Sequence, residues 1–155
     1  MRKLHIMVGN VGCGKSTRAH KLAERSGAVV ICMDEIQKMV AGGDYGAYDP
    51  NKRDLYQTIE ETAFTKSMVM GLDIVIDRTN MDRRTREKWI AMARSGGYSV
   101  CIHDFGSGTE EHLKRRQDDP RGVMPETWQG VFDAMKAKYE RPENAQGAEL
   151  IVRVR

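Results

Sequence analysis

The sequence has few cysteines, prolines and aromatic residues, and it has no long apolar run. Its three cysteines, Cys13, Cys32 and Cys101, are odd in number and far apart. We therefore expect no disulfide framework and a reducing, cytoplasmic location. No apolar stretch approaches the roughly 20 residues of a membrane-spanning helix, and the first residues do not resemble a secretory leader. These absences predict a protein without a membrane partner.

Histidines are also scarce, and their positions do not suggest a metal centre. The sequence holds His5, His20, His103 and His112. None of them shows the short spacing to another ligand that is typical of zinc sites, so the sequence predicts no zinc site. The oligomeric state is left open by the sequence.

What is present is an ordinary globular composition, with 40% hydrophobic and 30% charged residues among 155 and a net charge of +3. A chain of this length can bury a full core, and we expect one domain over residues 1–155. The mild excess of positive charge permits an anionic partner without establishing one.

Apolar runs alternate with helical patterns along the chain. Strands are expected at 3–8, 28–33, 72–76, 99–105 and 149–154, and helices at 15–26, 35–41, 52–70, 85–95, 109–117 and 125–139. Pro125 is expected in the first turn of the last helix. Such alternation implies right-handed crossovers and a mostly parallel sheet covered on both faces. The predicted fold class is α/β, with three layers in the order α/β/α.

A glycine-rich loop joins the first expected strand to the first helix. Residues 9–16 read GNVGCGKS, which fits the phosphate-binding pattern G-x-x-x-x-G-K-[ST]. In such a loop Lys15 neutralises β- and γ-phosphate charge, and the Ser16 hydroxyl can bind Mg²⁺. The pattern predicts a site for ATP or another nucleoside triphosphate at Gly12, Cys13, Gly14, Lys15, Ser16 and Thr17. The alternative is a glycine turn with an incidental lysine, and a dinucleotide fold is disfavoured because Lys15 and Ser16 replace the third glycine that it needs.

Two aspartates follow apolar runs and should lie at the carboxyl edge of the sheet beside this loop. Asp77 follows the run at 72–76 and is assigned to Mg²⁺, directly or through water. Asp34 follows the run at 29–33 and is assigned to the acceptor hydroxyl. The alternative is that Asp34 only caps a helix starting at Glu35.

Two further segments have functional and structural interpretations. The basic stretch 114–122 connects two expected helices, and its arginines could close over the nucleotide as part of a helical lid at about 109–124; the alternative is a solvated charged face.

The loop at 42–50 carries Tyr45 and Tyr48, which could stack on a base or be exposed turn residues.

The chain resembles the P-loop kinases of the polynucleotide 5′-hydroxyl kinase group, including the compact phage-type enzymes. The residues that carry the resemblance are the loop ending at Ser16-Thr17, the Asp34-Glu35 pair, and Asp77-Arg78-Thr79-Asn80 followed by Arg86. A lid with arginines then leads into Val123-Met124-Pro125-Glu126. The resemblance spans nearly the whole chain and implies a P-loop kinase fold.

The resemblance implies roles by position. Asp34 corresponds to the general base, Lys15 and Ser16 to the phosphate and magnesium residues, and Arg116 and Arg121 to a clamp on the transition state. Acceptor binding is expected at Gln37, Lys38, Arg78, Thr79, Asn80, Arg83 and Arg86. The chain departs from the phage-type pattern at Gln37, where that family carries an arginine that holds an acceptor phosphate. Its lid arginines are five residues apart instead of four.

Three functions follow as hypotheses. The favoured one is an ATP-dependent kinase that phosphorylates the 5′-hydroxyl end of DNA or RNA with Mg²⁺. The second is a kinase of a small molecule or modified nucleoside on the same scaffold. The third is a nucleotide-binding module without catalysis.

Overall fold

Five parallel strands form a single sheet in the computed structural model, which describes residues 1–44, 46, 48–144 and 147–154. They are β1 (Lys3–Val8), β2 (Val29–Cys32), β3 (Ile74–Asp77), β4 (Ser99–Asp104) and β5 (Leu150–Arg153). Their order across the sheet is β2-β3-β1-β4-β5, so the strand that leads into the glycine loop is central. All the expected strands are confirmed.

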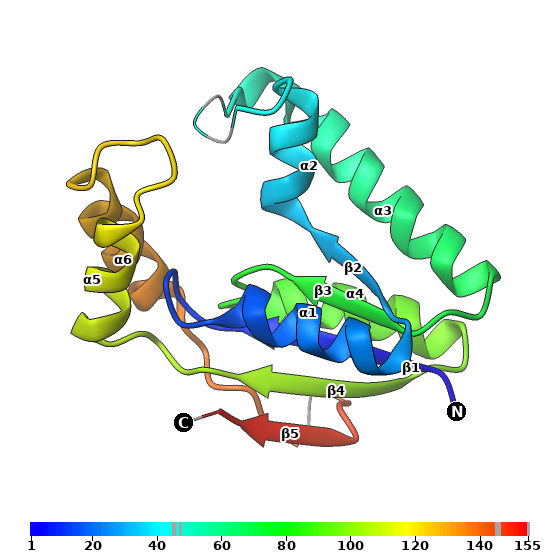
Figure 1. The fold of residues 1–155 in the computed structure, drawn as a ribbon. Coiled ribbons are helices and arrows are strands. Elements are labelled where there is room, and N and C mark those ends of the chain that lie inside the picture. The colour runs from blue at the N-terminus through cyan, green and yellow to red at the C-terminus, as the bar shows by residue number, and fades with distance from the viewer. Residues whose placement is uncertain (45, 47, 145–146, 155) are drawn as a thin grey trace.

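Helices connect the strands and cover the sheet (Figure 1). They are α1 (Lys15–Ser26), α2 (Met33–Val40), α3 (Arg53–Val69), α4 (Arg83–Ser95), α5 (Glu110–Asp118) and α6 (Thr127–Lys138), with a 3₁₀ turn η1 (Pro50–Lys52) before α3. Figure 1 shows α1 on one face of the sheet and α3 and α4 toward the other.

The alternation of side chains along β1 explains the layers. Leu4 and Ile6 pack with residues of α3 and α4, including Phe64 and Trp89, whose ring centroids are 5.2 Å apart. Met7 points to the opposite face, where it packs with residues of α1. Because both faces are covered, the sheet has the buried character typical of parallel sheets. The predicted three-layer α/β/α fold is confirmed.

Three helix starts differ from the expectation by two residues, and one of them is that of α4, which begins at Arg83 instead of residue 85. The second helix begins at Met33 with Cys32 as its N-terminal cap, so Asp34 lies inside the first turn and does not cap a helix starting at Glu35. The last helix begins at Thr127, because Pro125 and Glu126 form a turn ahead of it. Pro125 therefore precedes the helix instead of occupying its first turn.

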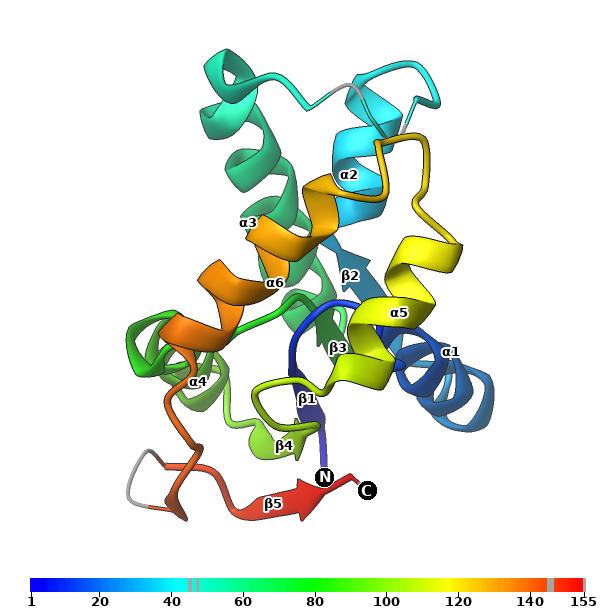
Figure 2. The same ribbon diagram turned by 90° about the vertical axis from the view of Figure 1, so that its left-hand side faces the viewer.

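The expected lid, residues 109–124, packs mainly against α6 and away from the two main cores (Figure 2). Leu113 of α5 joins Trp128 and Phe132 of α6 in a small apolar cluster, and Val11 of the glycine loop packs against it. Trp128 also donates from Nε1 to the carbonyl of Pro120 at 3.0 Å. The lid and the phosphate loop thus share one small core.

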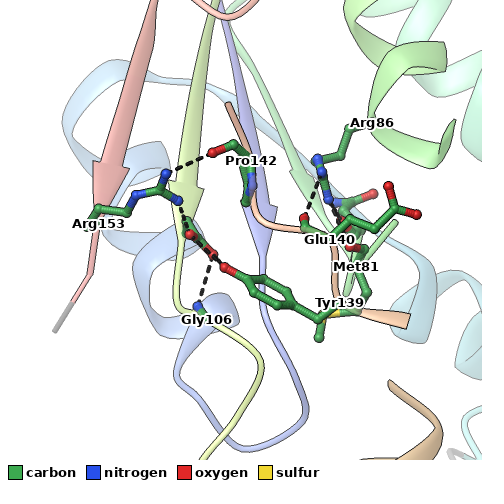
Figure 3. A network of polar contacts seen from close by, with 9 residues as sticks. Met81, Arg86, Gly106, Tyr139, Glu140, Pro142 and Arg153 are labelled. Carbon is green, nitrogen blue, oxygen red and sulfur yellow. Dashed lines mark hydrogen bonds and ion pairs between the residues drawn. The ribbon is translucent and has the colours of Figure 1, made fainter. Parts of the chain in front are cut away.

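Arg86 of α4 ties the loop just before this helix to the chain after α6 (Figure 3). Its side chain is fully buried. Nη1 donates to the carbonyls of Asn80 and Met81 at 2.9 Å each, and Nη2 donates to the carbonyl of Glu140 at 2.8 Å. Burial lowers the pKa of this guanidinium, and nearby carboxylates act in the opposite direction.

A second polar network ties the chain after α6 to β4 (Figure 3). The Tyr139 hydroxyl donates to Asp104 at 3.0 Å, and Arg153 forms an ion pair with the same carboxylate. Burial, followed by the charge of Asp104, raises the pKa of Tyr139 to about 12. Tyr139 therefore stays protonated and keeps donating at all physiological pH values.

Replacing Arg86 should destabilise the fold. In Arg86→Lys the charge remains, but a single ammonium cannot reproduce the fork that serves three carbonyls. We expect the free energy of unfolding to fall by about 2–4 kcal/mol in urea denaturation. The matched control is Arg94→Lys on the same helix, whose half-exposed side chain makes a long ion pair of 3.6 Å with Glu149; it should change stability by less than about 0.5 kcal/mol. Equal effects of the two substitutions would contradict the proposed bridging role.

Candidate active site

The phosphate-binding loop, residues 9–16, turns from β1 into α1 through two left-handed glycines. Gly12 has φ +73° and Gly14 has φ +92°, conformations that other residues adopt only with strain. Lys15 Nζ donates to the carbonyl of Asn10 at 2.7 Å and lies 3.7 Å from Cys13 Sγ. Burial raises the pKa of the Cys13 thiol despite this neighbouring ammonium, so Cys13 is a packed neutral thiol.

Asn10 fastens the phosphate-binding loop to the chain around the lid. Its side chain is fully buried, and Nδ2 donates to the carbonyls of Ser107 and Phe132 at 2.9 Å each. Its Oδ1 accepts from the backbone N–H of Val11 at 2.8 Å. Sequence reasoning missed Asn10, because it stands at a variable position of the loop pattern and its partners are about 100 residues away.

The lid lies directly against the loop. A β-carbon placed on Gly12 would be 2.0 Å from the carbonyl oxygen of His112 and 3.4 Å from Cβ of Arg116. Gly12 is therefore needed for the approach of α5 as well as for its own backbone conformation.

A cavity of about 240 Å³ lies between the loop and the lid. It is lined by Gly12, Gly14, Lys15, Ser16 and Thr17 from the loop and by Arg115, Arg116, Asp119 and Arg121 from the lid. The structure thus brings Arg116 and Arg121 to the phosphate-binding loop. It also brings Arg115, which sequence reasoning did not select.

The lid arginines are held in different ways. The Arg116 guanidinium lies 5.0 Å from the ring centroid of Trp128, a cation–π contact. Arg121 forms an ion pair of 3.8 Å with Asp119, and its φ of +54° is unusual for a residue with a side chain. Arg115 forms an ion pair of 2.5 Å with Glu111 on the same helix.

A second cavity, of about 480 Å³, adjoins the first and shares three residues with it: Lys15, Ser16 and Arg116. Its polar lining includes Asp34, Gln37, Asp77, Arg78 and Thr79, and its apolar lining includes Val11, Met33, Tyr48, Val123, Trp128, Val131 and Met135. Of the tyrosines expected in the 42–50 loop, Tyr48 lines this cavity, whereas Tyr45 lies outside the described residues.

Both predicted aspartates reach this second cavity. Asp34 comes from the first turn of α2 and is half-buried. Asp77 is the last residue of β3 and is 5% exposed, and its Oδ2 has no hydrogen-bond partner among the residues that the structure describes. Asp77 and Ser16 also line a third hollow together. The Ser16 hydroxyl and the Asp77 carboxylate, which has an oxygen unpaired among the described residues, are ligands that suit a hydrated Mg²⁺ ion.

The cysteine beside them is not a reactive group. Burial, and next the charge of Asp77, raise the pKa of Cys32 to about 12. Cys32 therefore remains a neutral thiol at physiological pH.

The predicted acceptor residues separate into two groups. Gln37, Arg78 and Thr79 line the 480 Å³ cavity, and Lys38 lies in the adjacent hollow with Glu35, its ion-pair partner at 3.8 Å. Three others are not among the residues that line these cavities: Asn80, Arg83 and Arg86.

Each residue of the second group has another environment. Asn80 is buried and donates to the carbonyl of Met7 at 2.7 Å, Arg83 pairs with Glu87 at 2.6 Å, and Arg86 is the buried bridge described above. The expectation that Arg86 flanks the acceptor site is therefore corrected, because its guanidinium is turned inward to backbone carbonyls.

Arg78 is held from behind by a buried carboxylate. Glu60 of α3 is fully buried, and its Oε2 accepts from Arg78 Nη1 at 2.9 Å. Burial raises the pKa of Glu60, and the charge of Arg78 opposes this shift. This ion pair holds the Arg78 guanidinium at the wall of the cavity, and the Glu60 carboxylate offsets part of its charge.

The chain is similar in sequence to a known protein. One curated relative, from Autographa californica nuclear polyhedrosis virus, is named "Putative bifunctional polynucleotide kinase/RNA ligase" and is 28% identical over 139 residues. The match covers 81% of this chain, and the chain spans 20% of the relative's length.

Solved structures share the fold at low sequence identity. A chain in the structure of the Pnkp1/Rnl/Hen1 RNA repair complex matches with a TM-score of 0.68 and 20% identity, over 90% of this chain and 46% of that one. A gluconokinase from Sinorhizobium meliloti 1021 matches with a TM-score of 0.60 and 20% identity, over 99% of this chain and 83% of that one. These similarities establish the P-loop kinase fold.

Among the described residues, no helix is both long and apolar enough to cross a bilayer.

A family model described as an AAA domain, AAA_33, matches residues 4–142, which include the phosphate-binding loop, both aspartates and the lid. The chain therefore belongs to the AAA_33 family of AAA domains and has a P-loop kinase fold.

Proposed function

We propose that the protein transfers the γ-phosphate of ATP to the 5′-hydroxyl end of a polynucleotide. The observation that carries the proposal is the junction of the two cavities. The smaller one has the lining of a triphosphate site, and the larger one is lined by the carboxylates of Asp34 and Asp77. The two cavities meet at Lys15, Ser16 and Arg116. A phosphoryl group bound at this junction would be open to an acceptor in the larger cavity.

On the donor side, the phosphate-binding loop and the lid supply the charge that phosphoryl transfer requires. Lys15 would leave the Asn10 carbonyl to bind β- and γ-phosphate oxygens, and Arg116 and Arg121 would neutralise the oxygens of the transferring group. Ser16 and Asp77 would hold Mg²⁺, which neutralises charge on the same phosphates when it is bound.

On the acceptor side, Asp34 would act as the general base. It would accept the proton of the attacking hydroxyl while the oxygen–phosphorus bond forms and the bond between the γ-phosphorus and the β–γ bridging oxygen breaks, with ADP as the leaving group. Asp34 is suited to this role because it lines the acceptor cavity itself, and the shared residues place that cavity beside the phosphate-binding loop.

The lining of the larger cavity favours an acceptor with a nucleobase. Trp128 and Tyr48 provide aromatic surface, and Met33, Val123 and Met135 add apolar walls. Bases stack on such side chains whatever their sequence. A sugar acceptor, in contrast, would make little use of this aromatic and apolar surface.

The ion pairing of the basic residues predicted to bind the acceptor favours a second candidate, a kinase of a modified nucleoside or another small molecule. Arg78, Lys38 and Arg83 are each ion-paired with a glutamate, and Gln37 stands where the phage-type enzymes carry a phosphate-binding arginine. Few cations are therefore ready to bind acceptor phosphates, and a short acceptor would need few.

The general base can be tested by Asp34→Asn. The amide keeps the shape of the side chain but cannot accept the proton, so kcat should fall by about 10²–10⁴-fold while ATP still binds. Glu35→Gln is the matched control, since it removes a neighbouring carboxylate from the same helical turn and should leave kcat nearly unchanged. The measurement is steady-state transfer from γ-labelled ATP. An unchanged kcat in Asp34→Asn would refute the assignment.

The contact between lid and loop can be tested by Gly12→Ala. The added methyl would meet the His112 carbonyl, so α5 should be displaced, its amides should exchange hydrogen faster, and ATP should bind more weakly. Gly27→Ala is the control for backbone strain alone, because Gly27 has φ +70° and open space around its β-position. If both variants left α5 equally protected, the lid would not depend on Gly12.

The acceptor class can be tested through salt. With 5′-hydroxyl oligonucleotides and saturating ATP, we expect log KM to rise with log salt with a slope of about 1.4, from about two phosphate contacts at about 0.7 each. Arg78→Gln should reduce this slope by about 0.7, whereas Arg94→Gln on the far end of α4 should not change it. Transfer to nucleosides or polyols with a flat salt dependence, and no transfer to oligonucleotides, would replace the favoured function by the second candidate.

A further inference from the structure

Three metal-ligating side chains meet on the α1 face of the sheet, away from the proposed active site. Strands β1 and β4 pair in parallel so that His5 lies opposite Cys101 and Met7 lies opposite His103. Because side chains alternate along a strand, Cys101 and His103 share one face of β4, and His5 joins them from β1. The spacing of these residues in the sequence predicted no zinc site, because the cluster arises only when the two strands pair.

The ligand atoms of this cluster lie close together. His5 Nδ1 and His103 Nε2 are 3.0 Å apart, Cys101 Sγ and His103 Nε2 are 3.5 Å apart, and all three atoms lie within 4.8 Å of one another. In a tetrahedral zinc site, bonds of about 2.1 Å to nitrogen and 2.3 Å to sulfur separate the ligand atoms by roughly 3.3–3.6 Å. Two of the three separations are thus already near those of a metal site.

We propose that His5, Cys101 and His103 bind a borderline-soft divalent cation of the Zn²⁺ type. Two imidazoles and one thiolate are a ligand set that such ions prefer over Mg²⁺. The three residues are only 8%, 9% and 2% exposed, so the ion would be largely shielded from solvent, and a water molecule would complete four-fold coordination.

The surroundings suit neutral imidazole ligands. Burial, and next the charges of His5 and Arg18, lower the pKa of His103 to about 4, and burial lowers the pKa of His5. Burial thus favours the neutral form of both rings, which is the form in which an imidazole binds a cation.

The thiol and its charged neighbours complete the environment. Burial raises the pKa of Cys101, whereas Lys3 and Arg18 act to lower it and favour the thiolate, and Asp73 lies near His5 with the opposite charge. Metal binding would displace the thiol proton.

The cluster is not satisfied by hydrogen bonds alone. The contact between His5 Nδ1 and His103 Nε2 can hold only one shared proton, so at most one of these two nitrogens donates to the other. An ion bound by three ligands would instead link β1, four residues before the phosphate-binding loop, to β4, which ends one residue after His103. Its role would be to fix these two strands relative to each other.

Co²⁺ titration tests the proposal because a cobalt–thiolate bond gives a charge-transfer band in the near ultraviolet. The full chain is titrated under a non-chelating reductant and excess Mg²⁺, which occupies oxygen-ligand sites. We expect a band that saturates at one equivalent, disappears on addition of Zn²⁺, and is accompanied by a higher Tm with Zn²⁺.

The variants identify the ligands. Cys101→Ser should abolish the band, and Cys32→Ser, which removes another thiol of the same sheet, should retain it. His5→Gln should weaken Co²⁺ binding by roughly tenfold or more while far-ultraviolet circular dichroism remains unchanged, so the test does not depend on one variant alone. Absence of the band in the unaltered protein, its persistence in Cys101→Ser, or unaltered affinity in His5→Gln would overturn the proposal. None of these measurements uses phosphoryl transfer, so the result is independent of the proposed kinase activity.

Discussion

The arrangement of the site depends on the hydrogen bonds of one buried amide, that of Asn10. From the phosphate-binding loop it reaches the backbone before α5 and the backbone within α6, so a single side chain positions the loop and both helices around the lid. The position of α5 over Gly12 and the contact of Val11 with the apolar cluster of α6 are consistent with this anchoring. This amide leaves neither of its donors unsatisfied. A shift of the backbone at Ser107 or Phe132 would leave polar groups unpaired in an apolar environment.

The two cavities differ in how their charges are held. In the phosphate cavity, Lys15 rests on a carbonyl and Arg116 on an aromatic face, and both contacts are weaker than a contact with phosphate oxygens. In the larger cavity, Arg78 is fixed by a fully buried glutamate and would be costly to move. Lys15 on the donor side can thus exchange its carbonyl for a ligand, whereas Arg78 on the acceptor side is held in place.

Local patterns in the sequence predicted the fold and the loop well, because each depends on neighbouring residues. The strand that precedes the glycine loop, the loop itself and the two aspartates at strand ends require no knowledge of distant contacts. The positions of Asn10 and Arg86 could not be predicted in this way. Their hydrogen-bond partners are backbone carbonyls up to 122 residues away, and a backbone carbonyl has no sequence signature. The residues around Arg86 have the composition of an exposed helix face. The sequence therefore favours a phosphate-binding role for Arg86, although its side chain is buried. The sequence pattern puts the start of α2 two residues too late. The strand runs directly into the helix with Cys32 as its cap, so no polar capping residue marks the start in the sequence.

The attachment of α6 at both its middle and its end restricts how the active site can open. Phe132 is held by Asn10, and beyond the helix Tyr139 and Glu140 are held by Asp104 and Arg86. An opening movement that kept these bonds would leave α6 in place and confine the motion to α5 and the connection that follows it, where Arg121 and Gly122 both have positive φ. Such a hinge would move the arginines of the phosphate cavity while Trp128 and Met135 stay in place with α6. Release of the spent nucleotide and release of the phosphorylated acceptor would then be separate events with separate barriers, set by different parts of the protein.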